Sequence, residues 1–92
     1  MSPEALDGNS RDRIEREVKA YLLGEFLPDE DPSALSSGTP LVSSGVLDSI
    51  SIVKLVSHLE STYGIEIQAH EFGADHLDTP AMIADMVVGK LR

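Results

Sequence analysis

The chain has 92 residues, carries 16 acidic against 7 basic side chains and contains no cysteine. This length allows one small domain with a single core. The formal charge of −9 disfavours nucleic acids and anionic membranes as partners and favours cationic protein surfaces. Without cysteine there is no disulfide, no thiolate nucleophile and no cysteine-held zinc, so any sulfur chemistry must arrive on a cofactor.

The sequence indicates neither a membrane span nor a signal peptide. No apolar run approaches the roughly 20 residues that cross a bilayer. The opening MSPEALDGNS lacks the positive start and the apolar stretch of a signal peptide. We therefore expect a cytoplasmic protein with a flexible polar leader over residues 1–9 and one domain over residues 10–92.

The first predicted helix runs from the end of the leader to about Leu23. Asn9 or Ser10 can cap its start, and Gly24 is expected to end it. Apolar residues repeat at helical spacing between charged neighbours. They are Ile14, Val18, Tyr21 and Leu22.

Residues 24–47 are rich in proline, glycine and serine, which excludes a long helix. So long a connection in a small domain must pack on the core. We therefore expect a packed crossover loop. The apolar side chains expected to anchor it are Leu35, Leu41, Val42, Val46 and Leu47.

The clearest predicted helix spans residues 49–63, with Asp48 as its N-cap and Gly64 as its end. Its apolar residues form one stripe. They are Ile52, Leu55, Val56, Leu59 and Tyr63.

The remaining third of the chain predicts further helical structure and no sheet. Residues 65–67 alternate like a strand but have no partner, so we expect an extended connection. Residues 70–76 predict one short helical turn, and a last helix opens at Thr79 with Pro80 in its first position. Its core face contains Ile83, Val87 and Leu91. Together the segments predict an all-α four-helix bundle with three long helices, one short helix and a long first crossover.

Familiar catalytic motifs are absent from the sequence. HEFGA begins like a zinc-protease H-E-x-x-H motif, but Ala74 stands where the second histidine should be. We expect surface residues rather than a metal site here. The residues concerned are His70, Glu71, Asp75 and His76. We also expect His58 to be exposed and the acidic segment 28–32 to be a solvated loop.

Ser49 stands at the start of the strongest predicted helix, directly after Asp48. Its hydroxyl should be exposed, and a phosphate attached there would meet the positive end of the helix dipole. No histidine or lysine adjoins it in sequence to activate it. On chemistry alone, a simple helix start remains the plainer interpretation, and Ser51 is interpreted as a solvated helix residue.

The segment GVLDSISIVKLVSHLESTYGIEI resembles the second helix of phosphopantetheine-dependent acyl and peptidyl carrier proteins. Their D-S-[LI] hallmark corresponds to Asp48, Ser49 and Ile50. Further residues stand at the family's spacing, and they are Leu55, Leu59, Glu60, Tyr63 and Ile67. The likeness extends to TPLVSSGVLDS before this helix and to EFGADHLDTPAMIADMV after it, which includes Asp78 and Thr79.

The resemblance implies a carrier that catalyses nothing itself. A phosphopantetheinyl transferase would move the phosphopantetheine arm of coenzyme A to the Ser49 hydroxyl, and the arm's thiol would hold an acyl or aminoacyl group as a thioester. Asp48 would help to engage the transferase and its metal ion. The other expected partners are a loading enzyme, either an adenylation enzyme or an acyltransferase, and a downstream condensing or transferring enzyme. The residues expected to face partners are Ile50, Val53, Lys54 and Ser57.

The sequence departs from the fatty-acid carriers in one respect. Their second helix is strongly acidic, whereas Lys54 and Glu60 are the charged residues of 49–63 and cancel. We therefore expect a discrete monomeric carrier of polyketide or nonribosomal peptide type in specialised metabolism. Two alternatives remain open: a fatty-acid carrier, and a noncovalent acidic helical interaction module in which Ser49 only begins a helix.

Overall fold

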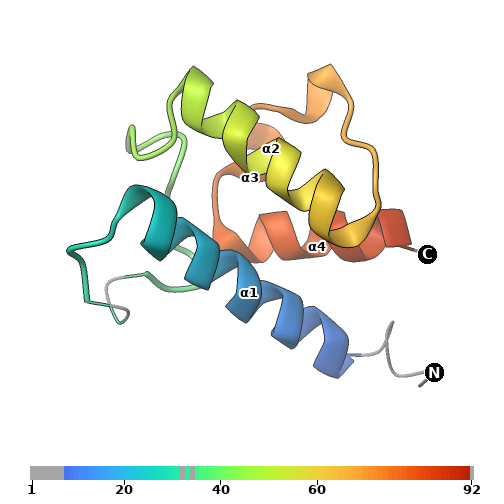
Figure 1. Cartoon of the computed structure of the whole chain (residues 1–92), viewed down its shortest axis with the longest axis horizontal. Coiled ribbons are helices and arrows are strands. Elements are labelled where there is room, and N and C mark those ends of the chain that lie inside the picture. The colour runs from blue at the N-terminus through green and yellow to red at the C-terminus, as the bar shows by residue number, and fades with distance from the viewer. Residues whose placement is uncertain (1–7, 32, 34, 92) are drawn as a thin grey trace.

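The protein is an all-helical domain in the computed structural model, which describes residues 8–31, 33 and 35–91 (Figure 1). Its helical elements are α1 (Gly8–Phe26), α2 (Ser49–Tyr63), the 3-10 turn η3 (Ala69–Glu71), α3 (Ala74–Leu77) and α4 (Pro80–Leu91). No strand occurs among the described residues. The prediction of an all-α four-helix fold is confirmed, because three long helices and the short α3 surround one core.

The core forms where the apolar stripes of the three long helices meet. Helices α1 and α2 run in opposite directions, and α4 packs mainly on α1 (Figure 1). Two tyrosine hydroxyls join α1 to α2: Tyr63 donates to Glu17 at 2.6 Å and Tyr21 donates to the Lys54 carbonyl at 3.3 Å. Side chains that are less than 2 % exposed fill the centre. They include Ile14, Val18, Leu22, Leu41, Leu55, Leu59, Leu77, Ile83 and Val87.

Helix α2 has the predicted bounds because both of its ends are fixed by local chemistry. Asp48 is extended (φ −89°, ψ −175°), and its carboxylate accepts the backbone N–H of Ser51 at 2.8 Å. Gly64 ends the helix in the left-handed region at φ 66°, which glycine adopts without steric cost. The predictions for both caps are confirmed.

Helix α1 is longer than predicted at both ends. It begins at Gly8, so the predicted cap at Asn9 or Ser10 is wrong. Gly24 lies within the helix, so the predicted stop there is also wrong. Pro28 explains the actual end, because a proline disfavours the helical region for the residue before it. Residues 1–7 of the predicted leader lie outside the described residues.

The long connection between α1 and α2 packs on the core, as predicted. Leu35, Leu41 and Leu47 are all less than 5 % exposed. Between α2 and η3, residues 65–67 form a connection that is neither helix nor strand, as predicted, and Ile67 is buried. The single turn predicted over 70–76 is instead two short elements, η3 and α3.

Helix α4 starts as predicted. Its first position is Pro80, and the Thr79 hydroxyl oxygen accepts the backbone N–H of Met82 at 3.1 Å. Ile83 and Val87 are buried. Among the described residues, no helix combines the length and the apolar character that a bilayer crossing requires.

Candidate functional site

Ser49 is the first residue of α2 and is exposed, as its neighbour Asp48 is. Hydrogen bonds from the backbone N–H and side chain of Ser51 lower the pKa of Asp48, so this carboxylate is ionised at neutral pH. Ser51 is half-buried, and its N–H serves the cap. The cap therefore leaves the Ser49 hydroxyl in solvent, beside a fixed negative charge.

One face of α2 next to Ser49 is apolar and exposed. Ile50 is 71 % exposed and Val53 is 54 % exposed, although both are large hydrophobic side chains. Lys54 and Ser57 are exposed as well. Spacings of three and four residues place these side chains on one helix face, away from the core. We call Ile50, Val53, Lys54 and Ser57 the α2 outer face.

Asp78 holds the loop that leads into Ser49. Its Oδ1 atom accepts three successive backbone N–H groups, those of Leu41 at 3.2 Å, Val42 at 2.9 Å and Ser43 at 2.8 Å. The Ser43 hydroxyl donates to its Oδ2 at 2.9 Å, and the Asp78 carbonyl accepts the Leu41 N–H at 2.6 Å. These hydrogen bonds, that of the Ser43 backbone N–H above all, lower the pKa of Asp78. From the sequence, Asp78 was expected only as part of the family resemblance, since its contacts join residues more than 30 positions apart.

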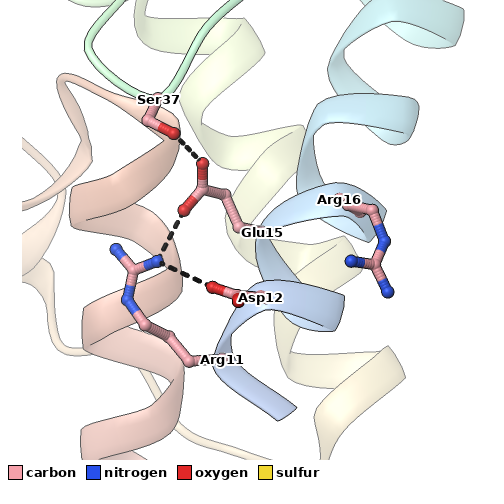
Figure 2. Close-up of a pocket in the computed structure, with 5 residues that line it drawn as sticks. All are labelled: Arg11, Asp12, Glu15, Arg16 and Ser37. Atoms are coloured by element: carbon pink, nitrogen blue, oxygen red, sulfur yellow. Dashed lines mark hydrogen bonds and ion pairs between the residues drawn. The ribbon is translucent and has the colours of Figure 1, made fainter. Parts of the chain in front are cut away.

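A polar cluster around the buried Glu15 joins α1, the crossover loop and α4. Figure 2 shows Glu15 between Ser37 and Arg11, with Arg16 pointing away. Glu15 is 7 % exposed and accepts hydrogen bonds from the Ser37 hydroxyl and from Arg11 Nη1 at 2.6 Å, while Lys19 Nζ lies at 3.2 Å. The Ser37 hydrogen bond is the main cause of the lowered pKa of Glu15, with Arg11 and Lys19 adding to it against the effect of burial. We call Arg11, Glu15, Lys19 and Ser37 the Glu15 cluster.

The Glu15 cluster borders an open pocket of about 330 Å³ that Asp12 and Arg16 also line. Arg11 reaches across to α4, where its Nε donates to Asp85 at 2.6 Å and its Nη2 donates to the Ala81 carbonyl at 3.3 Å. Three of the charged residues that line this pocket, Arg11, Asp12 and Glu15, are thus engaged with one another. We interpret the pocket as a gap at the contact between α1, the crossover loop and α4.

His58 and the acidic Asp31 both contact other residues of the protein. His58 is half-buried and stacks on Tyr21 with 3.8 Å between ring centroids, so the expectation of an exposed histidine is wrong. The spacing of residues within one helix does not predict this contact, since Tyr21 belongs to α1 and His58 to α2. In the acidic segment 28–32, Asp31 accepts the N–H and hydroxyl of Ser33, which lowers its pKa.

The residues around HEFGA are placed on η3 and α3. Glu71 pairs with Lys90 at 2.8 Å and accepts the Gln68 N–H at 2.8 Å. The rings of His70 and His76 lie 6.5 Å apart between centroids. Within the part of the chain that the structure describes, no group of three or more histidine, aspartate or glutamate side chains could hold a metal ion.

The structure is a small helical domain that presents a serine and an adjacent aspartate at an exposed helix start, as the resemblance to carrier proteins led us to expect. The sequence model of the family described as "Phosphopantetheine attachment site" matches residues 22–87, which is more than half of the chain. The chain belongs to this phosphopantetheine-binding family of carrier proteins. The group that the family carries on its attachment site is phosphopantetheine, and its members act as carriers rather than as catalysts.

Curated relatives include D-alanyl carrier proteins of Streptococcus pyogenes serotype M5 (strain Manfredo), serotype M49 (strain NZ131) and serotype M1. Each is 43 % identical to this chain over 47 residues, which is 51 % of this chain and 60 % of the relative. The chain thus spans less than two thirds of the length of these relatives.

Proposed function

We propose that Ser49 is the phosphopantetheine attachment residue and that the protein carries an aminoacyl or acyl group as a thioester on that arm. Residues 10–92 would then act as one carrier domain. The observation that carries the proposal is the exposed hydroxyl of Ser49 at the start of α2, inside the segment matched by the family. In the transfer, the Ser49 oxygen would bond to the phosphorus that bears the pantetheine arm and give its proton to a base of the transferase. The pyrophosphate bond to the nucleotide part of coenzyme A would break, and the nucleotide would leave.

The residues present fit a phosphate ester. The first turn of α2 has backbone N–H groups without intrahelical acceptors, and a helix N-terminus favours negative charge. Asp48 is exposed and ionised, so its carboxylate is accessible to a divalent cation held by the transferase. When bound, the arm supplies the thiol that this cysteine-free chain lacks.

The α2 outer face is the proposed contact surface for partner enzymes. Ile50 and Val53 expose apolar area directly beside Ser49, and burial of that area favours association. Lys54 and Ser57 extend this face by one turn. Proposed partners are a phosphopantetheinyl transferase, a loading enzyme of adenylation or acyltransferase type, and a condensing or transferring enzyme.

The D-alanyl carrier relatives favour an aminoacyl cargo and an adenylating loading enzyme. The neutral charge of α2 favours carriers of peptide or polyketide assembly in specialised metabolism over a fatty-acid carrier, because a docking helix without net charge depends less on basic partner patches. Family membership disfavours a noncovalent interaction module. We propose that this carrier domain is monomeric and acts in the cytoplasm.

The test compares the wild type with Ser49→Ala and Ser51→Ala. Each protein is incubated with coenzyme A, magnesium and a broad-range phosphopantetheinyl transferase, and its intact mass is measured. We expect wild type and Ser51→Ala to gain one phosphopantetheine group and Ser49→Ala to gain none. A mass gain in Ser49→Ala, or none in the wild type while a control carrier is modified, contradicts the proposal.

The cargo is tested on the modified protein. It is offered D-alanine, other amino acids and short acyl groups with the matching adenylating or acyl-transferring enzymes, and thioester formation is read from the mass. We expect loading with an amino acid. Loading only from acyl donors would instead support a fatty-acid or polyketide role.

A further inference from the structure

We propose that Asp78 is a positioning residue for the modification of Ser49: it fixes the loop of residues 41–47 so that the start of α2 is presented to the transferase. This inference rests on the proposed function of Ser49. Asp78 lies at the end of α3, and it acts through the loop rather than by contact with Ser49.

The first link is the attachment of the loop to Asp78. Three successive backbone N–H groups converge on one carboxylate oxygen, with distances of 2.8–3.2 Å, and the Ser43 hydroxyl donates to the other oxygen at 2.9 Å. Successive N–H groups that point at one anion form a nest, and hydrogen bonds to a charged acceptor are stronger than neutral ones. One side chain thus fixes the backbone of three loop residues.

The second link joins this anchor to α2. The Leu47 N–H donates to the Leu41 carbonyl at 2.9 Å, so the loop closes on the residue whose own N–H is held by Asp78. Both leucines are at most 2 % exposed. Asp48 and Ser49 follow Leu47 directly in the chain.

The third link is the turn between these residues. Gly45 has φ 88°, a left-handed conformation that favours glycine, and its N–H donates to the Val42 carbonyl at 3.1 Å. The Ser44 hydroxyl donates to the Pro40 carbonyl at 2.7 Å. The loop is therefore a closed unit whose side-chain attachment to α3 is the Asp78 carboxylate.

Loss of this anchor should act on recognition. If only a fraction of molecules holds the loop in the competent arrangement, the apparent affinity of the transferase falls by that fraction. Once the carrier is bound to the transferase, the same Ser49 hydroxyl reacts, so the rate of the bound complex should change little. We therefore expect Asp78→Ala to raise the transferase KM for the carrier about tenfold and to leave kcat within about twofold.

Ser37→Ala is the matched control. It removes the hydrogen bond that ties an earlier residue of the same connection to Glu15, and it leaves the contacts of residues 41–47 in place. We expect KM and kcat of this variant within about twofold of the wild type. Asp78→Asn retains an oxygen acceptor and should give a KM between those of the wild type and Asp78→Ala. This variant also tests the inference if Asp78→Ala does not fold.

Amide hydrogen exchange supplies a second readout. In Asp78→Ala the amides of Val42 and Ser43, which bond to the carboxylate, should exchange faster, and so should that of Leu47, which closes the loop. The Leu41 amide keeps its bond to the backbone carbonyl of residue 78, and the Ser51 and Ile52 amides, which bond to Asp48, should not change. An unchanged KM in a folded Asp78 variant, or unchanged exchange of the loop amides, overturns this inference alone. Absence of modification in the wild type overturns the proposed function of Ser49 and this inference with it.

Discussion

The start of α2 and the Glu15 cluster use polar side chains in opposite ways. At the start of α2, Asp48 and Ser49 are exposed and the apolar Ile50 stands in solvent. In the cluster, Glu15 is buried and held by three partners from α1 and the crossover loop. The comparison indicates that the scaffold contains the stronger charge interactions, while the surface proposed for chemistry is organised by a helix cap and remains accessible.

Replacement of Glu15 should have the largest effect on stability. Glu15→Ala removes a buried acceptor and leaves Ser37, Arg11 and Lys19 without their common partner. Hydrogen bonds to charged groups contribute about 1.5–3 kcal/mol, so we expect a loss of about 2 kcal/mol in the free energy of unfolding. Denaturant unfolding followed by circular dichroism measures it. Phosphopantetheine transfer at a temperature where the variant is folded should be near the wild-type rate, and a strong loss of transfer would break the separation of the two regions.

The contribution of Glu15 should also depend on pH. Its pKa in the folded state is lowered, first by the Ser37 hydrogen bond, from a reference value of 4.5. A carboxylate with a lowered folded pKa stabilises the fold above the unfolded pKa and loses that contribution as pH falls through the folded value. The stability difference between wild type and Glu15→Gln should therefore be full at pH 7 and shrink below pH 4.5. A difference that is independent of pH would contradict the ionic role of Glu15.

Asp48→Asn tests the role of charge at the start of α2, the other of the two regions compared. Asparagine caps helices about as well as aspartate, so the stability should change little. The ionised carboxylate is lost, and we expect transfer to Ser49 to slow by at least about tenfold if that charge engages the metal ion of the transferase. Initial rates from intact mass measure this effect. Asp48→Ala is the companion variant, and equal transfer rates in Asp48→Asn and the wild type would reduce Asp48 to a helix cap.

Ile50→Ala should have the smallest effect on stability. The side chain is 71 % exposed, and surface substitutions away from special features usually change stability by less than about 0.5 kcal/mol. Loss of apolar contact area should nevertheless raise the KM of partner enzymes severalfold. Ser61→Ala is the control, since Ser61 is exposed near the far end of the same helix. Equal KM values for both variants would remove Ile50 from the contact surface.

The features that the sequence predicted are those encoded by neighbouring residues. The bounds of α2 follow from an apolar stripe and from Asp48 and Gly64, each of which acts within one turn of the helix. The exposure of Ser49 follows from the same local pattern. The prediction that α1 ends at Gly24 is wrong because one glycine destabilises a helix only modestly, and packing of Leu23 and Phe26 on the core carries the helix on to Phe26.

The contacts that the sequence did not predict join distant segments. The Ser37 hydroxyl meets Glu15 and the loop amides meet Asp78 across separations of 22 and of 35–37 residues. Periodicity and capping rules do not report on such pairs. The stack of His58 on Tyr21 is of the same kind, because it depends on how α1 and α2 lie against each other.

The central claim is that Ser49 bears the phosphopantetheine arm. The most direct measurement is tandem mass spectrometry of peptides from the wild-type protein after treatment with coenzyme A and the transferase. We expect the added group on Ser49 in the peptide that contains residues 45–53, with Ser51 unmodified. Attachment to Ser51 or to a serine outside α2 would contradict the account.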